Sequence, residues 1–298
     1  MTLWGRFLTC GRFSIGLDAR RLIGKPVGNR PQVKDLPRRA VTAVAIMVLC
    51  VPTFGQSFSR MRDGKPDLQG YWATRVFFSA FDLEEHKQAA FGVPAGPGVV
   101  VDPPDGKIPY QPWALEKKKD LVEHHLYEDP QAHCILSGVP RQMYTPFGFQ
   151  ILQPSGYLVF FYEAFHAFRI IHLDGRPHPP ATIKMFEGDS RGRWDGDSLQ
   201  VDVTNMNDRT WFDMGGNFHS DAIHVIERYT PADANTIRYQ ATIEDPKVFT
   251  RPWKIAFPLG RNPDPKYEQL EYACVEGEAD LEHYVVEVGG QNAGGQKK

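Results

Sequence analysis

The 298-residue chain is poor in cysteine and carries almost no excess charge. Its four cysteines are too few for a disulfide-dense scaffold, and its formal net charge is only −2. Residues 1–55 hold nine of the 34 basic and two of the 36 acidic side chains, so the remainder has a formal charge of −9. Because nucleic acids and anionic membranes are bound by basic patches, this balance predicts neither as a partner.

Long hydrophobic runs are also missing. The longest apolar run, Ala40–Val51, is about a dozen residues long, whereas a membrane-spanning helix needs ~20. Two arginines precede this run and small residues follow it before Gln56. That order is typical of a secretory signal peptide. We therefore expect residues 1–55 to combine an over-extended start with a removed signal, and the product to be periplasmic or extracellular, without stable membrane insertion.

Neither repeats nor Ser-rich linkers divide residues 56–298, which predicts one domain with a substantial core and specifies no oligomeric state. Residues 92–112 are rich in proline and glycine and predict a loop, and a flexible tail is expected from about residue 289. After residue 55 only Cys134 and Cys274 remain. In an oxidising compartment such a pair usually forms a disulfide, worth roughly 4 kcal/mol by chain entropy; two buried thiols are the alternative.

Hydrophobic periodicity predicts a mainly β fold. Two helices are expected in the N-terminal half, over residues 82–90 and 112–127. From Phe149 onward the period is two, and six short strands are expected without helices between them. The strands are predicted over residues 157–163, 167–173, 199–203, 222–229, 237–243 and 253–259. Such an antiparallel meander must form a sandwich, protect its edges, or close into a barrel.

The short links between strands favour the barrel, and so does one local motif. Gly70-Tyr71-Trp72 resembles the G-x-W that opens the first strand of lipocalins. That resemblance implies a lipocalin-like (calycin-type) barrel. Four further blocks, "GRWDGDSLQVDVTNMNDRTW", "HSDAIHVIERY", "EDPKVFTRPW" and "LEYACVEGEADLEH", resemble an uncharacterised family of exported bacterial proteins. This second resemblance covers residues 67–283 and implies a single exported domain, with no activity attached.

Two motifs resemble functional sites but lack the neighbouring residues or secondary structure that such sites require. Gly188–Gly192 spells the G-x-S-x-G of a serine nucleophile elbow, which needs a helix after Ser190. Instead the Asp195-Gly196 pair follows, a strong signal for a type I′ hairpin turn. The aspartates and asparagines of residues 195–208 lack the glycine and closing glutamate of a calcium loop. We predict neither a metal site nor a cofactor.

Histidines are the other candidates for chemistry. His219, Asp221 and His224 have a metal-like spacing, but on a continuous strand His224 points away from the other two. If the face carrying His166, Phe168, Ile170 and His172 lines the barrel, two histidines would lie in an aromatic cavity near Glu163. A buried histidine or carboxylate among aromatic rings is suited to acid–base catalysis. The candidate catalytic residues are His166, His172, His219, His224, Glu163 and Asp213.

Three functions remain open. The leading one is binding of a small, largely apolar or aromatic molecule, because small-molecule pockets are mostly apolar with a few polar anchors. The candidate ligand-binding residues are Tyr157, Phe161, Phe168, Trp211 and Arg228. The second is an acid–base isomerase, lyase or hydrolase on the same scaffold. The third is a periplasmic or surface interaction protein, which would have a filled interior and an exposed apolar patch.

Overall fold

The computed structural model of the chain describes residues 58–88 and 94–274, which belong to one compact unit. Several sequence predictions fall outside these residues. They are the signal peptide within residues 1–55, the first two residues of the 92–112 loop, and the tail from about residue 289.

The described chain contains ten strands, one α-helix and several short 3₁₀ turns. The strands are β1 (Gly70–Thr74), β2 (Val100–Asp102), β3 (Gly148–Leu152), β4 (Tyr157–Tyr162), β5 (Phe168–His172), β6 (Asp189–Asp195), β7 (Ser198–Thr204), β8 (His224–Asp233), β9 (Thr236–Glu244) and β10 (Trp253–Arg261). The helix is α1 (Pro112–His124), and the 3₁₀ turns are Phe77–Ala80, Leu126–Glu128, Pro130–His133 and Arg141–Met143.

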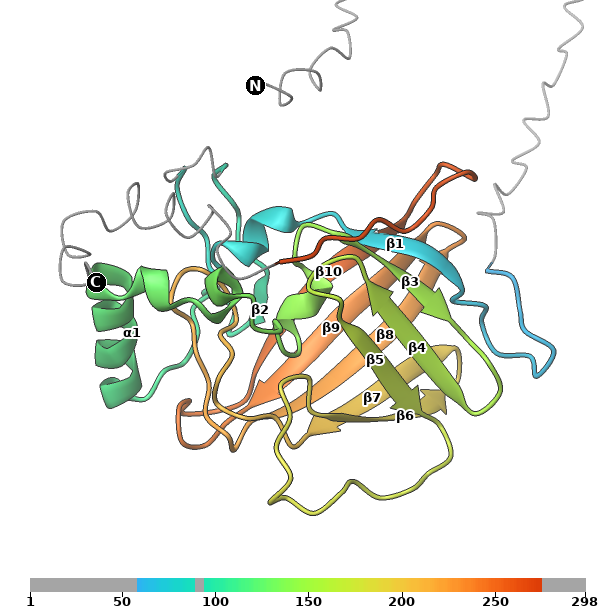
Figure 1. Ribbon diagram of the computed structural model, residues 1–298. Helices are drawn as coiled ribbons and strands as arrows, with labels where there is room; N and C mark the ends of the chain where they lie inside the picture. The colour runs from blue at the N-terminus through green and yellow to red at the C-terminus, as the bar shows by residue number, and fades with distance from the viewer. Residues whose placement is uncertain (1–57, 89–93, 275–298) are drawn as a thin grey trace, which may run out of the picture. The chain divides into compact units, whose positions relative to one another are not determined.

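Nine of these strands close into a barrel (Figure 1). Their order is β1-β3-β4-β5-β6-β7-β8-β9-β10, and β10 pairs back onto β1. The closing contact is short, with Trp72 opposite Arg261 and Thr74 opposite Leu259. β2 pairs with the other end of β10, outside the ring. The prediction of a mainly β, lipocalin-like barrel is confirmed, and Gly70-Tyr71-Trp72 opens its first strand.

One strand pair departs from the predicted meander. β5 and β6 run parallel, with Ile171 opposite Ser190, whereas the other pairs in the ring are antiparallel. Parallel neighbours need a long crossover, since the chain must return to the end from which it started. Residues 173–188 form that crossover, the long loop at the bottom of Figure 1. The barrel is therefore mixed rather than purely up-and-down.

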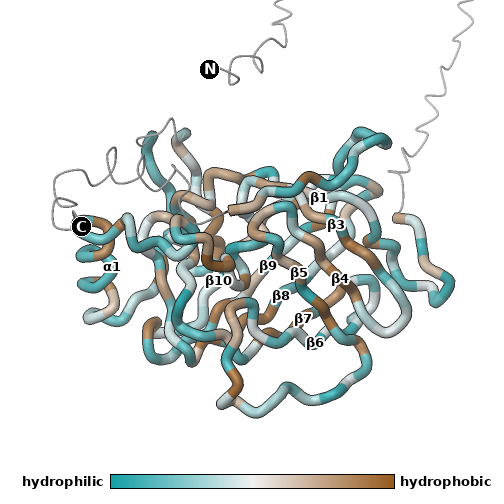
Figure 2. Tube along the Cα trace, in the orientation of Figure 1, coloured by the Kyte–Doolittle hydropathy of each residue, from teal (hydrophilic) through white to brown (hydrophobic). Residues whose placement is uncertain are grey.

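Alternation along the strands sets the inner face of the barrel. In β7 the side chains of Leu199, Val201 and Val203 are fully buried, and β9 buries Ile237, Tyr239, Ala241 and Ile243 in the same way. The Asp195-Gly196 turn joins β6 to β7 as the sequence predicts. Figure 2 shows the hydrophobic positions gathered on the strands and the hydrophilic positions on the loops around them.

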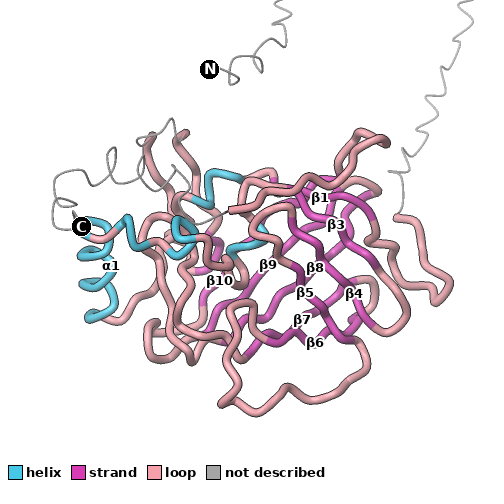
Figure 3. The backbone as a smooth tube through the Cα atoms, in the orientation of Figure 1, coloured by secondary structure: helices cyan, strands magenta, loops and turns pink. Residues whose placement is uncertain are grey.

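The helical predictions are half right. α1 begins at Pro112 as expected and stands beside the barrel (Figure 3). The helix expected over residues 82–90 is not formed in the part of it that is described, residues 82–88. There the chain bends, and His86 pairs with Gly96 in a short bridge. The carboxylates at its start, Asp82 and Glu84, instead accept hydrogen bonds from neighbouring loops.

A loop segment closes one end of the barrel. All nine residues of 137–145, which we call the plug, are buried. Its Met143 sulfur accepts a hydrogen bond from the hydroxyl of Tyr162 on β4 and lies 3.6 Å from the hydroxyl oxygen of Tyr229 on β8. The guanidinium of Arg141 forms a buried bidentate pair with Asp129 at 2.6 Å. This pairing compensates the buried Arg141 charge, while Arg141 Nε and Gln142 Oε1 have no partner among the described residues.

Below the plug, a polar network crosses the barrel interior. Arg169 on β5 forms a bidentate ion pair with Glu227 on β8 and donates a third hydrogen bond to Ser190 at 2.7 Å. The hydroxyls of Tyr229 and Tyr239 both donate to Glu227 Oε1, at 2.9 and 2.8 Å. Burial, together with the nearby Glu227 charge, raises the tyrosine pKa values well above their ordinary range. Both hydroxyls therefore keep the protons that they donate.

We expect Glu227→Gln to lower the free energy of unfolding by about 3–5 kcal/mol, because it leaves the buried Arg169 charge without a counter-charge. The double change Arg169→Met/Glu227→Leu should recover only part of that loss, since it removes the unpaired charge but leaves the hydroxyls of Tyr229 and Tyr239 without their acceptor. Tyr239→Phe, which removes one hydrogen bond, should cost about 1 kcal/mol. Urea unfolding followed by tryptophan fluorescence measures all three. A Glu227→Gln protein as stable as the wild type would contradict this account.

Candidate functional site

A small hollow lies where the plug end of the barrel meets the last described residues of the chain. Its volume is about 200 Å³. We call it the aromatic hollow; its lining residues are Ala80, Phe81, Asp129, Gln131, Ala132, Thr145, Pro146, Phe147, Phe165, Met214, Tyr272 and Cys274. Most of these side chains are apolar, and four of them are aromatic rings.

The aromatic wall is built by a segment that returns from the far end of the barrel. After β10, residues 262–274, the C-terminal segment, run back beside β1 (Figure 1). Tyr272 stacks on Phe147 with ring centroids 4.7 Å apart and meets Phe165 edge-on at 5.9 Å. Backbone hydrogen bonds join Tyr272 to the β4–β5 turn in both directions, at 2.9 and 3.2 Å. The rings are therefore fixed before any ligand arrives.

Two further devices hold the C-terminal segment in place. The predicted disulfide between Cys134 and Cys274 is present. Glu163, which is nearly buried, accepts hydrogen bonds from Tyr267 Oη, from Leu270 N at 3.0 Å and from Gly148 N at 2.8 Å. One carboxylate thus joins the start of β3 to the C-terminal segment, and the disulfide fixes the end of that segment beside the hollow.

The turn that presents Phe165 has a strained backbone. Phe165 and His166 adopt φ angles of 63° and 51°, the left-handed region that residues with a Cβ rarely occupy. Each such residue costs on the order of 1 kcal/mol, and strain of this kind concentrates at binding sites. Here the strained turn directs the Phe165 ring against Tyr272.

One end of the hollow is polar. The Asp129 carboxylate is fully engaged by Arg141 and by the backbone of Gln131. The Gln131 side-chain amide donates to Ser137 Oγ and to Thr145 Oγ1. No residue in the described part of the chain donates to Gln131 Oε1. A ligand with a hydroxyl or amine group would find an acceptor there, beside an apolar body of rings.

The face expected to line the barrel lies outside it. Phe168 is 59% exposed and Ile170 is 40% exposed. Arg169 and Ile171, which alternate with them along β5, are buried and point inward. His172 lies on this outer face, and His166 sits in the exposed turn, with Nε2 2.7 Å from Glu271 Oε1. The expectation of two histidines in an aromatic cavity is therefore wrong. Both faces of β4 and β5 carry large apolar residues, so their pattern did not distinguish inside from outside.

The other candidate catalytic residues lie apart from one another. His219 is buried, with Nε2 accepting from Thr210 Oγ1 at 2.7 Å and Nδ1 donating to Ser220 O at 2.9 Å; burial lowers its pKa. Asp213 is fully buried, and its carboxylate accepts hydrogen bonds from the backbone of Leu83 and the side chain of Asn217. Burial and the nearby Asp82 raise the Asp213 pKa to about 7.

His224 belongs to a surface network of histidine–carboxylate contacts that the sequence did not reveal. Its Nε2 lies 3.1 Å from Asp202 Oδ1, and the same oxygen lies 3.1 Å from His178 Nε2. His178 Nδ1 is 2.6 Å from Asp189, which also binds Arg191. His178 comes from the proline-rich crossover, where no periodic pattern places a side chain. Neither histidine lines the aromatic hollow.

The candidate ligand-binding residues are not gathered at one place either. Tyr157, Phe161 and Phe168 lie on the outer face of β4 and β5, where the Phe161 and Phe168 rings are 6.5 Å apart. Trp211 packs partly buried against the core. Arg228 faces outward on β8 and pairs with Asp195 at 2.9 Å. None of these five lines the aromatic hollow. Its walls come from chain segments far apart in sequence, for which only the disulfide gave a clue.

Within the described residues there is no group of three or more His, Cys, Asp and Glu placed to hold a metal ion. In the same part of the chain, no helix is long and apolar enough to cross a membrane. Comparisons with protein-family models, with curated proteins and with solved structures found no match.

Glu187 lies where the crossover meets the plug. Its Oε1 accepts from Gly138 N at 3.1 Å, while its buried Oε2 has no partner among the described residues. Burial raises the Glu187 pKa from 4.5 to about 7, although Arg169 acts in the opposite direction. The unfolded chain loses this proton near pH 4.5 and the folded chain near pH 7. The contribution of Glu187 therefore lowers stability as the pH rises through this window, and is constant above it.

We expect Glu187→Gln to reduce the stability lost between pH 5 and pH 8, by at most about 3 kcal/mol. Asp213, whose pKa is also raised, keeps part of the dependence in the same direction. The exposed Glu123→Gln is the control and should follow the wild-type curve. Urea midpoints measured at half-unit pH steps test the prediction. Wild-type and Glu187→Gln curves that stay parallel would show that Glu187 is ionised in the folded protein.

Proposed function

We propose that this protein is an exported β-barrel that binds a small, single-ring apolar or aromatic molecule in the aromatic hollow. The observation that carries the proposal is a hollow of about 200 Å³ with ring walls and a polar end at Gln131. Small-molecule sites are mostly apolar with a few placed polar groups. Since an apolar cavity of about 150 Å³ holds benzene, this volume suits one ring with a substituent.

Among the described residues, buried side chains take up much of the barrel interior. The plug occupies one end, and the Arg169–Glu227 network crosses the middle. In this respect the protein differs from barrels that enclose a ligand in their interior. Binding in the aromatic hollow instead uses rings that are only partly covered and therefore accessible from solvent.

The geometry supports binding over acid–base catalysis. An acid–base enzyme needs a histidine and a carboxylate that converge in one cleft. The aromatic hollow is not lined by histidine, and its Asp129 carboxylate is engaged by Arg141. His166 and Glu271 form an exposed pair outside it. The interaction-protein alternative is supported by the exposed aromatic face of β4 and β5, which the ligand test below includes as a competing site.

Export is the second part of the proposal. It is supported by the arginine-flanked apolar run Ala40–Val51 and by the Cys134–Cys274 disulfide, because structural disulfides persist in oxidising compartments. The disulfide fixes the segment that carries Tyr272. The aromatic hollow should therefore be fully formed only in an oxidising compartment.

Expression of the full chain in a bacterial host should give a product in the periplasm or the medium. Its N-terminus should lie close to Gln56, and its mass should increase by two thiol adducts only after reduction and alkylation. N-terminal sequencing and intact mass spectrometry of each fraction provide the measurements. A cytoplasmic product that keeps residues 1–55 and has all four cysteines as free thiols would overturn the export proposal.

The exported protein, with its disulfide formed, should bind phenol or indole saturably in calorimetric titration. Phe147→Ala should weaken this binding about tenfold, because a stacked ring contact and its buried area are lost. Cys274→Ser should weaken it in the same direction by releasing the Tyr272 wall. Phe161→Ala is the matched control, since it removes the same ring from the outer face of β4, and it should leave the affinity unchanged.

Two outcomes would overturn the proposed site. One is wild-type affinity in Phe147→Ala, with thermal unfolding confirming that the variant is folded. The other is binding that survives Phe147→Ala but is abolished by Phe168→Glu, which would place the probe on the outer face of β4 and β5.

A further inference from the structure

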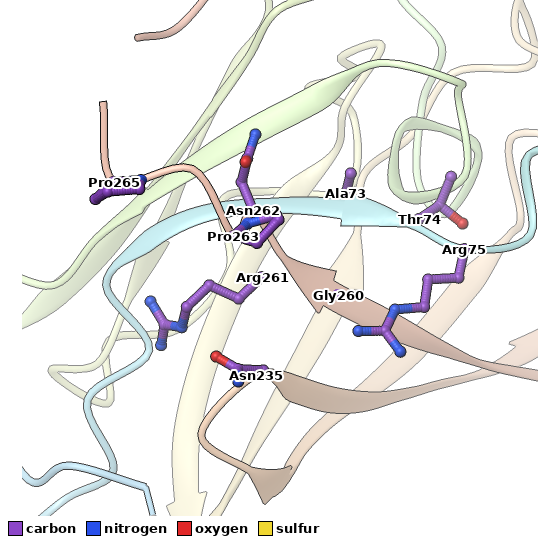
Figure 4. A pocket seen from close by; sticks show the side chains of 9 residues that line it. All are labelled: Ala73, Thr74, Arg75, Asn235, Gly260, Arg261, Asn262, Pro263 and Pro265. Atoms are coloured by element: carbon purple, nitrogen blue, oxygen red, sulfur yellow. The ribbon is translucent and has the colours of Figure 1, made fainter. Parts of the chain in front are cut away.

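A second, larger groove follows the short junction where β10 closes onto β1 (Figure 4). Its volume is about 820 Å³. We call it the arginine groove; its lining residues are Ala73, Thr74, Arg75, Asn235, Gly260, Arg261, Asn262, Pro263 and Pro265. Two of these residues are cationic and none is acidic, although the chain after residue 55 has a formal charge of −9.

Arg261 is fixed in position without a carboxylate partner. Its Nε donates to Ala234 O at 2.9 Å and one terminal nitrogen donates to Gln69 O at 2.6 Å. The guanidinium also lies over the Trp72 ring, 4.3 Å from its centroid. Partial burial lowers its pKa, while the charge of Asp67 acts in the opposite direction. An arginine keeps its charge under these conditions, so a preorganised cation remains with free N–H donors.

Arg75 supplies a second cation beside the same strand. It is exposed, and it has no hydrogen-bond or ion-pair partner in the described part of the chain. Its guanidinium lies against Gly260, where an added Cβ would be 2.3 Å from Arg75 Nε. Gly260 does not have a positive φ angle, so its backbone does not require glycine. The contact shows that the Arg75 side chain lies over the β10 backbone at this position.

Polar side chains complete the groove. Figure 4 shows the two arginine side chains along the junction on either side of Gly260, with Asn235 between their guanidinium groups in this view. The Asn235 side chain makes no hydrogen bond to a described residue and is free to donate. Pro263 and Pro265 give the groove an apolar wall. Planar guanidinium groups bind carboxylate and phosphate oxygens in a bidentate manner.

We propose that the arginine groove binds a small organic anion, with a carboxylate or phosphate group held by Arg75, the charge of Arg261 adding to the attraction further along the groove, and an apolar body lying along Pro263 and Pro265. The volume is in the range of small-molecule sites. This site is separate from the aromatic hollow and does not depend on what the hollow binds.

Isothermal titration with inorganic phosphate and with benzoate, each at constant ionic strength in chloride, tests the proposal on the exported protein. At least one of the two anions should bind saturably. Arg75→Gln should weaken that binding at least tenfold. Preference for phosphate or for benzoate would identify the headgroup, and either preference supports the site.

Arg193→Gln is the matched control. Arg193 is exposed on β6, has Gln200 as its hydrogen-bond partner, and lies outside the groove, so its loss changes the net charge equally. It should change the affinity less than twofold. Arg75→Gln removes no hydrogen bond or ion pair to a described residue and should fold like the wild type, as thermal unfolding will show. Absence of binding by both anions, or equal weakening by Arg75→Gln and Arg193→Gln, would overturn the proposal.

Discussion

The ion pair between Arg169 and Glu227 determines what the interior of this barrel can hold. Because the two residues lie on β5 and β8, their side chains meet across the interior, and Tyr229 and Tyr239 satisfy the remaining acceptor capacity of Glu227. Such a pair is tolerated only when each polar group has a partner. The Met143 sulfur of the plug lies against the hydroxyls of Tyr229 and Tyr162. The middle and the plugged end of the barrel are thus filled by side chains that stabilise the fold. Both proposed sites lie outside the barrel interior.

Much of the fold followed from the sequence because it rests on local signals. Period-two patterns predicted β7 and β9, and Asp195-Gly196 predicted the hairpin turn. Two features were missed for physical reasons. The parallel β5–β6 pair depends on where a sixteen-residue crossover returns, which no local pattern specifies. The plug contains arginine and glutamine and so resembles an exposed loop; it is buried because Arg141 meets Asp129.

The candidate site was harder to predict. On β4, Phe160 and Phe161 are equally apolar, yet only Phe160 points inward, so alternation alone gave two equivalent assignments. The aromatic hollow joins Phe147, Phe165 and Tyr272, whose separations in sequence exceed any helix or strand period. The disulfide was the one useful clue, since pairing Cys134 with Cys274 brings the segment carrying Tyr272 to this end of the barrel. The histidines were candidates because of their residue type alone. In the structure most of them are hydrogen-bonded residues of the surface or the core.

Both proposed sites occur where the barrel must be completed by contacts between distant segments. The arginine groove follows the short β1–β10 junction, where three residue pairs close the ring and leave Gly260 open to Arg75. The aromatic hollow forms where the C-terminal segment meets the β4–β5 turn, which Glu163 and the disulfide hold together. At such junctions regular strand pairing ends, so side chains from several segments face solvent without covering one another. When side chains fill the interior of a barrel, the concave surfaces that solvent can reach lie at these junctions. Ligand binding is therefore expected there.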